Sequence, residues 1–447
     1  MQLLLNSMEA TCISYKETGY FSPTVIDYLE DKAALKPFYS YRPTIEGFTL
    51  LLENKEVTAN RQLLSDVLYQ QYFGQEATPL RFADVVKAHI ELLRQDNTFT
   101  ITTGHQLNIF AGPLYFIYKI VTAIKLAKQL KEAFPDKNFV PVYWMATEDH
   151  DFAEINYTNI GGKKVQWQLD AAGATGRLDV KTIRQALNQY KGVLGMEGHA
   201  PELAEIVETA YTVFPRLADA TRYLVNALFG LYGLVIVDGD APELKQQFAP
   251  YIEQDILEQQ SFKNIAATDE ELKALGVHLQ VNPREINFFY LLDNLRERLV
   301  VEGNRYKVLN SDISFSAEEL QQEINAHPER FSPNVVMRPL YQEIILPNIA
   351  YIGGGAEVVY WLQLKRNFDH YGIGFPALLL RNSGLVVRKE TGSKINRLGF
   401  TAHELLQPPT NSRTNGLKPI PSTTCHLKKN IAKYKPFLSA LSCVPIK

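Results

Sequence analysis

One stretch of the sequence, residues 99–151, constrains the fold more than any other part of the chain. It opens within the run Thr98–Thr103, whose β-branched residues are typical of a short buried strand. A glycine-bearing turn follows, and Pro113 predicts a helix start with proline at the first helical position. Residues 139–145 form a second apolar run. Between the two runs, apolar residues recur at nearly helical spacing, namely Leu114, Ile117, Val121, Ile124 and Leu130.

A strand, a helix and a second strand of this length predict one right-handed parallel crossover. In sheets of this kind, ligands bind just beyond the carboxyl ends of the strands. Two polar segments follow the predicted strands, Gly104–Asn108 and Thr147–Asp151. We therefore expect them to lie together at one edge of the sheet.

The same order of strand and helix recurs later in the chain and predicts an α/β fold with four or five parallel strands. Residues 233–237 and 349–352 are short apolar runs typical of strands covered on both faces, and 377–380 is another. Residues 277–281, 287–292 and 299–309 instead indicate short strands between turns. The predicted organisation is a helical part packing on the core (1–95), core segments (96–154, 201–264 and 333–405), an insertion (155–200), a second inserted α+β unit (265–332) and an irregular tail (406–447).

Composition narrows the class of protein. The chain has 447 residues, long enough for two or three domains, and its net charge of −3 argues against a broad nucleic-acid-binding surface. The three cysteines, Cys12, Cys425 and Cys443, form no pair with metal-ligand spacing. No apolar stretch approaches the ~20 residues that span a bilayer, and the N-terminus does not resemble a signal peptide. We expect a cytoplasmic protein that does not enter a membrane.

The turn after the first strand is a candidate anion-binding element. Backbone amides near Gly104 and the positive end of the following helix favour a phosphate or a carboxylate. His105, Gln106 and Asn108 could add hydrogen bonds to a bound nucleotide. The alternative is that the glycine only shapes the turn and that His105 is a surface residue. The pattern matches neither the Walker loop nor the dinucleotide fingerprint.

An acidic cluster, Glu148-Asp149-His150-Asp151, follows the second strand. In an extended chain Asp149 and Asp151 face the same side and His150 faces the other. The two aspartates could hold a magnesium ion, an ammonium group or a sugar hydroxyl, with His150 beside them. Zinc is also possible, although spacing identifies no further ligand. The alternative is a solvated acidic turn.

Further candidates follow the later strands. Asp238 could contact a ribose or an amine, or simply belong to the acidic first turn of a helix. Arg338 could grip a substrate carboxylate through its planar guanidinium, or form a structural ion pair.

The run Gly353-Gly354-Gly355 allows a ligand to approach the backbone closely. Glu357 follows it at the start of a predicted helix, and Tyr360 and Trp361 are candidates for a pocket wall or for the core.

Taken together, these motifs resemble the bacillithiol biosynthesis cysteine-adding enzymes. The resemblance covers roughly residues 1–405. It implies a Rossmann-like core akin to nucleotidyl-transferases and class I aminoacyl-tRNA synthetases, with inserted connective domains. The segments that carry it are Thr103–Gln106, Ala111–Tyr115 with Lys119, Trp144–Asp151, Glu154 with Ile155, His327–Ser332, Val336–Glu343 and Gly353–Trp361.

The resemblance implies a ligase that attaches cysteine, through its carboxyl group, to the amine of glucosaminyl malate. It also implies a homodimer formed through a C-terminal coiled coil. No heptad pattern follows residue 405, where a segment rich in Pro, Asn and Ser stands instead.

Joining a carboxylate to an amine in water requires activation, for which ATP is the expected cofactor, with magnesium possible. We expect the segments Gly104–Asn108 and Gly353–Gly355 to hold phosphates. Asp149 or Asp151 would act as metal ligand or base, and Arg338 or Lys119 would bind the malate carboxylates.

Two alternatives remain open at this point. One is a metal-dependent hydrolase, with Asp149, His150, Asp151 and Asp238 around the ion. The other is a non-catalytic nucleotide-binding module on the same fold.

Overall fold

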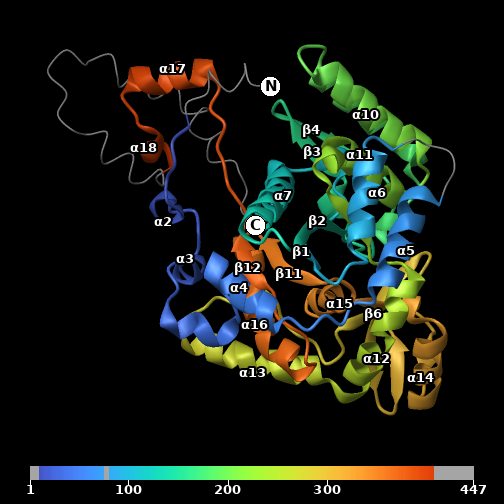
Figure 1. The fold of residues 1–447 in the computed structure, drawn as a ribbon. Helices are drawn as coiled ribbons and strands as arrows, with labels where there is room; N and C mark the ends of the chain where they lie inside the picture. The colour runs from blue at the N-terminus through green and yellow to red at the C-terminus, as the bar shows by residue number, and fades with distance from the viewer. Residues whose placement is uncertain (1–9, 75–79, 407–447) are drawn as a thin grey trace. The chain divides into compact units, whose positions relative to one another are not determined.

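Five parallel strands form the central sheet of the protein (Figure 1). The computed structural model describes residues 10–74 and 80–406. Every neighbouring pair in this sheet runs parallel, which confirms the predicted α/β class. In spatial order the strands are β12 (Ala377–Leu380), β11 (Asn348–Gly353), β1 (Thr98–His105), β2 (Asn138–Met145) and β5 (Val235–Asp238).

Helix α7 (Leu114–Ala133) makes the crossover from β1 to β2 and covers one face of the sheet. Its buried apolar positions are Phe116, Ile120, Ala123, Leu126, Ala127 and Leu130. Leu114 and Val121, which belong to the predicted apolar series, are 55% and 42% exposed. The helix is confirmed, but its buried face is rotated from the one that the apolar series marks. It also begins one residue later than predicted, because Pro113 is its N-cap.

Two later helices cover the opposite face of the sheet through contacts between aromatic side chains. Tyr351 of β11 stacks on Trp361 of α16 (Gly355–His370), with ring centres 4.3 Å apart. Trp144 of β2 meets Tyr341 of α15 (Arg338–Ile345) edge-on at 5.4 Å. Both faces of the sheet are therefore buried, as its continuous apolar strands predict.

A second, antiparallel sheet lies in the predicted inserted α+β region. Residues 277–281, expected as a strand, lie outside all strands of the described chain. Helix α14 (Ala317–Ala326) comes before the last strand of this sheet in the chain and begins with a capping box of Ser316 and Glu319. The strand order is β10 (Phe331–Pro333), β6 (Phe288–Leu292), β7 (Leu295–Glu302), β8 (Arg305–Val308) and β9 (Ser314–Phe315).

A two-stranded hairpin, β3 (Tyr157–Ile160) and β4 (Lys163–Gln166), occupies the start of the other predicted insertion. Its turn is formed by Gly161 and Gly162, both with positive φ, a conformation that suits a two-residue hairpin turn.

Further helices surround the two sheets (Figure 1). No helix among the described residues is long and apolar enough to cross a membrane. The helices are α4 (Ile45–Asn54), α5 (Arg61–Phe73), α6 (Ala83–Leu92), α8 (Phe152–Ile155), α9 (Arg184–Leu194), α10 (Ala200–Val213), α11 (Leu217–Phe229), α12 (Pro242–Glu258) and α13 (Gln260–Ala274).

The chain divides into two compact units, residues 27–384 and a second unit of residues 1–26 with 385–447. In the second unit the described helices include α2 (Tyr15–Thr18), α17 (Lys389–Leu398) and α18 (Ala402–Leu406). The predicted tail from residue 407 onward lies outside the described residues, as do Cys425 and Cys443. The predicted domain boundaries remain predictions.

Candidate active site at the carboxyl edge of the sheet

The loops that follow β1 and β2 meet at the carboxyl edge of the parallel sheet. In register, His105 at the end of β1 lies opposite Met145 at the end of β2. Just beyond them, Gln106 Nε2 donates to Asp149 Oδ2 at 2.7 Å and to Glu154 Oε2 at 2.9 Å. The two polar segments that the sequence places at one edge are therefore in direct contact.

Gly104 and His105 belong to the strand rather than to the turn, which corrects the expected end of β1. The His105 ring stacks on Phe116, with centres 5.1 Å apart, and its Nε2 is buried without a hydrogen-bond partner among the described residues. Burial, together with the cationic Lys119 and Arg381, lowers the pKa of His105 well below its usual value. His105 is therefore a neutral, largely enclosed ring, and the alternative of a surface histidine is wrong.

The turn between β1 and α7 depends on Gly112, which has φ 54° and ψ −147°. A Cβ at this position would lie 2.4 Å from Cβ of Asn108, so a side chain there would force the turn apart. Asn108 itself donates from Nδ2 to the Glu154 carbonyl at 3.2 Å. Its Oδ1 is buried and accepts no hydrogen bond from the described residues.

Lys119 connects the two glycine-containing segments from inside the protein. Its Nζ donates to the Gly104 carbonyl at 2.7 Å and forms an ion pair with Glu357 Oε2 at 2.6 Å. Burial lowers the pKa of Lys119, and Glu357 opposes that effect. The structure thus gives Lys119 two internal partners, although the expectation was a role in binding malate.

The three consecutive glycines serve the start of α16. The amide of Gly354, the N-cap residue, donates to Glu357 Oε2 at 2.7 Å, and a Cβ at Gly353 would lie 2.9 Å from Glu357 Cβ. Gly355 is the first residue of the helix. The helix end that was expected to hold a phosphate already carries a carboxylate from its own first turn.

Arg338 lies where β1, β2 and β11 end. Its guanidinium is 5.8 Å from the ring centres of both Trp144 and Tyr351, and its Nη1 donates to Gln342 Oε1 at 2.9 Å. Nη2 is buried without a hydrogen-bond partner among the described residues. A buried N–H that makes no hydrogen bond costs about 1–3 kcal/mol, which a bound anion would offset.

Positive charge exceeds negative charge in this part of the edge. Arg338 and Arg381 both lower the pKa of Lys119 through charge repulsion, after the larger effect of burial. Glu357 is the carboxylate that pairs with Lys119 there. The local balance fits an anionic group, either a phosphate or a carboxylate.

The acidic cluster is held by an arginine from the antiparallel sheet. Arg296 Nη1 of β7 donates to His150 Nδ1 at 2.6 Å and lies 4.0 Å from Asp149 Oδ1. Because a guanidinium only donates, Nδ1 must accept, and the proton of neutral His150 is on Nε2. Asp151 is exposed, and its backbone amide donates to Asp149 Oδ1 at 3.3 Å. Arg296 and Gln106 thus hold Asp149, while His150 and Asp151 remain exposed, so the alternative of a solvated turn stays open for those two residues.

Glu148, the first acid of the cluster, points into the protein. Its carboxylate forms a close ion pair with Lys245 of α12, whose side chain is fully buried. Lys245 Nζ also donates to the Phe331 carbonyl of β10 at 2.8 Å. This pair links the end of β2 to both α12 and the antiparallel sheet.

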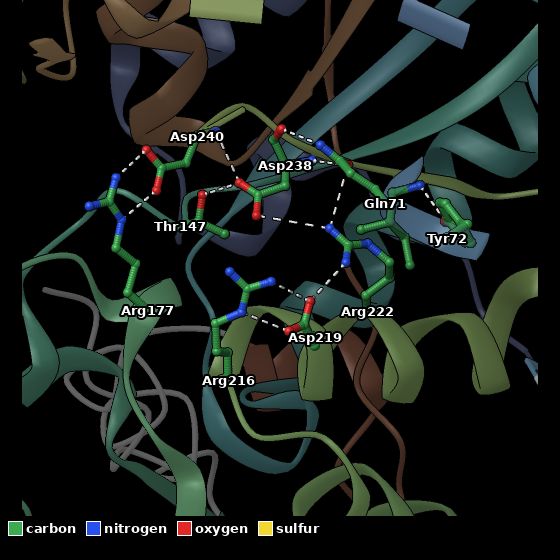
Figure 2. A network of polar contacts seen from close by, with 10 residues as sticks. Gln71, Tyr72, Thr147, Arg177, Arg216, Asp219, Arg222, Asp238 and Asp240 are labelled. Carbon is green, nitrogen blue, oxygen red and sulfur yellow. Dashed lines mark hydrogen bonds and ion pairs between the residues drawn. The ribbon is translucent and has the colours of Figure 1, made fainter. Parts of the chain in front are cut away.

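Asp238 belongs to a polar network at the end of β5 (Figure 2). Its Oδ1 accepts from Thr147 Oγ1 at 2.5 Å, and Arg222 Nη2 lies 3.9 Å from Oδ2. Asp240 beside it accepts two hydrogen bonds from the Arg177 guanidinium, at 2.8 and 3.0 Å. Burial, followed by the charge of Asp240, raises the pKa of Asp238. These contacts give Asp238 internal partners in place of the ribose or amine that the sequence suggested.

Tyr360 and Trp361 differ in their surroundings. Trp361 has no exposed surface and packs against Tyr351, Phe368 and Phe375, so it is a core residue. The Tyr360 hydroxyl accepts from Trp361 Nε1 at 3.1 Å.

The charges of the described residues fit an anionic cofactor. The surplus cationic charge around Lys119 and Arg338 fits the phosphates of ATP. By contrast, no group of three or more His, Cys, Asp or Glu side chains in the described chain is arranged to hold a metal. Asp149 faces a guanidinium at 4.0 Å instead. Because one or two carboxylates together with substrate phosphates can hold magnesium, the expected metal role of Asp149 and Asp151 stays a prediction.

Several residues of this edge were not identified from the sequence. Arg296 and Lys245 reach the acidic cluster from β7 and α12, and Arg177 reaches Asp240 from the first insertion. Each is a single basic residue without a surrounding motif, so the sequence offers no local signal for it.

Comparison with known proteins places the chain in a family. Residues 8–382 match the family model described as "Bacillithiol biosynthesis BshC, N-terminal Rossmann-like domain". The chain belongs to the BshC family. The parallel sheet thus lies within the Rossmann-like domain of that family.

Individual members of the BshC family align over most of the chain. A Flavobacterium psychrophilum protein is 48% identical over 402 residues, 89% of this chain and 74% of the relative. A Flavobacterium johnsoniae protein is 48% identical, covering 90% and 76%. A Bacillus mycoides protein is 28% identical, covering 91% and 78%. All three are named "Putative cysteine ligase BshC".

Proposed function

We propose that this protein is an ATP-dependent ligase that joins the carboxyl group of cysteine to the amine of glucosaminyl malate, forming bacillithiol. The relatives named as cysteine ligases support the reaction class. The observation that carries the proposal is Arg338, a buried arginine at the carboxyl edge whose Nη2 has no hydrogen-bond partner among the described residues. Arg338 and the Gln106–Asp149 contact belong to the same edge of the sheet, which suits a substrate that carries carboxylates and an amine.

Arg338 binds a carboxylate of the malate moiety in this proposal. Its Nη1 is fixed by Gln342, so the guanidinium presents Nη2 in a set orientation. Lys119 has a different role, since its ammonium already joins Gly104 to Glu357. Lys119 keeps these two segments together and contributes positive charge without direct contact with the substrate.

Asp149 receives the proton of the attacking amine. Gln106 orients its Oδ2 at 2.7 Å, and the side chain is 31% exposed, so a substrate can reach it. His150 presents its Nε2–H as a donor, because Arg296 occupies Nδ1. Most of the catalytic effect would come from orientation and charge.

ATP supplies the activation of the cysteine carboxyl group that amide formation in water requires. The positive charges of Lys119 and Arg338, which lie beside Gly104 of β1, would attract its phosphates. Neutral His105 excludes water from this surface through its stacking on Phe116. With these substrates we expect the reaction to take place in the cytoplasm.

The test is mass spectrometry of glucosaminyl malate, cysteine and ATP with the purified protein, each component omitted in turn. We expect bacillithiol only in the complete mixture. Product without ATP would refute the proposed activation. Bound metal, together with a hydrolytic activity that needs no ATP and is lost on chelation, would favour the hydrolase. Binding of ATP without any turnover would favour the non-catalytic module.

Substitutions at Arg338 test whether its guanidinium binds glucosaminyl malate. A hydrogen bond to a charged group is worth about 1.5–3 kcal/mol, so Arg338→Met should lower kcat/KM for glucosaminyl malate by about 10- to 150-fold. Arg338→Lys should recover part of the loss. Arg366→Met is the matched control, because Arg366 pairs with Glu271 on the surface at 2.6 Å. Equal activity of the Arg338 and Arg366 variants would remove Arg338 from the site.

A further inference from the structure

A cavity of about 270 Å³ lies at the opposite, amino edge of the parallel sheet. It is formed by the end of α4 and by residues 372–375, which precede β12. Its apolar walls are Tyr41, Leu51, Ile373 and Phe375. A water molecule in the liquid occupies about 30 Å³, so the cavity has room for a small organic molecule.

Lys55 is the cationic group of this cavity. Its side chain is only 6% exposed, and its nearest carboxylate oxygen, Glu343 Oε2, is 3.8 Å away, too far for a hydrogen bond. Glu343 Oε2 is itself buried without a hydrogen-bond partner in the described chain. A Cβ at Gly374 would lie 3.3 Å from Lys55 Nζ, so the glycine keeps the space beside the ammonium open.

These contacts leave Lys55 under-coordinated for a buried charge. An ammonium has three N–H donors, and removing them from water without acceptors is costly. Burial accordingly lowers the pKa of Lys55, while the charge of Glu343 opposes the effect. An oxygen-bearing anion in the cavity would supply the acceptors that the protein does not provide there.

The solvent side of the cavity is negatively charged. Glu56 and Asp369 also line it, and both are exposed, so they lie on its solvent side. Lys365 forms an ion pair with Asp369 at 2.5 Å. That contact does not neutralise the charge of Glu56. Lys55 thus places a positive charge beside the buried Glu343 carboxylate, and the solvent side of the cavity is acidic. Lys55 and Glu56 together match a molecule that carries both charges.

We propose that this cavity binds a small zwitterion, a free α-amino acid, with its carboxylate on Lys55 and its ammonium group toward Glu56 and Asp369. The apolar walls accommodate a short side chain. A simple anion fits less well because the acidic side repels it. A simple amine fits less well because Lys55 repels it.

The test uses L-alanine as the probe, with acetate and ethylamine as probes that carry only one of its charges. Binding is followed by NMR at the δ1-methyl group of Ile373, a wall residue that is 5% exposed. The resonance is assigned by its absence in Ile373→Val. We expect a saturable shift with L-alanine, and at least tenfold weaker binding of acetate and ethylamine. The absence of a saturable L-alanine shift would overturn the proposal.

Three variants locate the binding groups. Lys55→Met should abolish the alanine-induced shift, whereas Lys128→Met, on the exposed side of α7, should leave it unchanged. Glu56→Gln, an exposed substitution that leaves the core intact, should weaken alanine binding several-fold and strengthen acetate binding. Unchanged affinities in both Lys55→Met and Glu56→Gln would refute the assignment. Arg296→Met, which alters the acidic cluster of the proposed ligase site and has no contact with Glu343, should retain the shift, so the two proposals can fail separately.

Discussion

The buried ion pair between Glu148 and Lys245 should make a large contribution to stability. Lys245 is 0% exposed and the Glu148 side chain is 10% exposed. Lys245 Nζ also donates to the Phe331 carbonyl at 2.8 Å. Lys245→Met fills nearly the same volume but leaves a buried carboxylate and a buried carbonyl without their partner.

The expected cost follows from this geometry. Removing one partner of a buried ion pair typically destabilises a protein by about 3–5 kcal/mol, because the remaining charge stays buried. The double variant Lys245→Met/Glu148→Gln removes that charge and should be only about 1–2 kcal/mol less stable than the natural protein. Partners in direct contact are non-additive in this way.

Urea unfolding measures these differences. Far-UV circular dichroism reports the whole fold, and tryptophan fluorescence reports the surroundings of Trp144, Trp167 and Trp361. Trp144 contacts Tyr341, which lies beneath Lys245. Coincident transitions are required before the midpoints are converted into free energies. Lys128→Met, an exposed substitution, should change stability by no more than about 0.5 kcal/mol.

Two results would refute the reasoning. One is a cost below about 1 kcal/mol for Lys245→Met, since a lone buried carboxylate cannot be tolerated so cheaply. The other is a double variant that is as unstable as the sum of the single variants. Either result would mean that the buried Glu148 carboxylate does not need the Lys245 ammonium as its partner.

Three further predictions concern other parts of the chain. Arg296→Met removes the donor to His150 Nδ1 and should slow bacillithiol formation by about 10- to 100-fold in the mass-spectrometric assay. Its circular dichroism spectrum should be unchanged, and full activity would exclude this contact from the mechanism. Trp361→Ala should cost about 3–5 kcal/mol in urea unfolding, because the ring is fully buried; a cost under about 1 kcal/mol would contradict a core role. Burial raises the pKa of Asp255 above 3.8, so its ionisation opposes folding and native stability falls as pH rises from about 4 through the folded pKa. Asp255→Asn should therefore gain stability relative to the natural protein across that window, whereas Glu258→Gln, on the exposed side of the same helix, should show no such trend.

The parallel sheet could be predicted because its signals are local. The apolar runs and the turns between them identify each strand without knowledge of its neighbours. The exact end of β1 could not be predicted, because Gly104 and His105 stay extended through pairing with Trp144 and Met145. The apolar series that includes Leu114 and Val121 marked a helix correctly but not the face it buries, which depends on where the sheet lies.

The candidate site was predicted in position but only partly in its contacts. The edge that brings Gln106 to Asp149 follows from strand direction alone. The glycine run before α16 suggested a phosphate-binding loop, yet Glu357 caps that helix from within. A capping side chain and a ligand favour the same backbone amides, so the sequence does not distinguish them.

The sequence by itself determined that the chain forms a parallel α/β sheet with polar residues at its carboxyl edge. Strand and helix formation depend on patterns within about ten residues, which are present in the sequence. Only the tertiary structure decided which partner each buried cation has, giving Glu357 to Lys119, Glu148 to Lys245 and the neutral His150 ring to Arg296. Charge interactions depend on separation and burial in space, and each of these pairs joins residues about 100 or more positions apart in the chain.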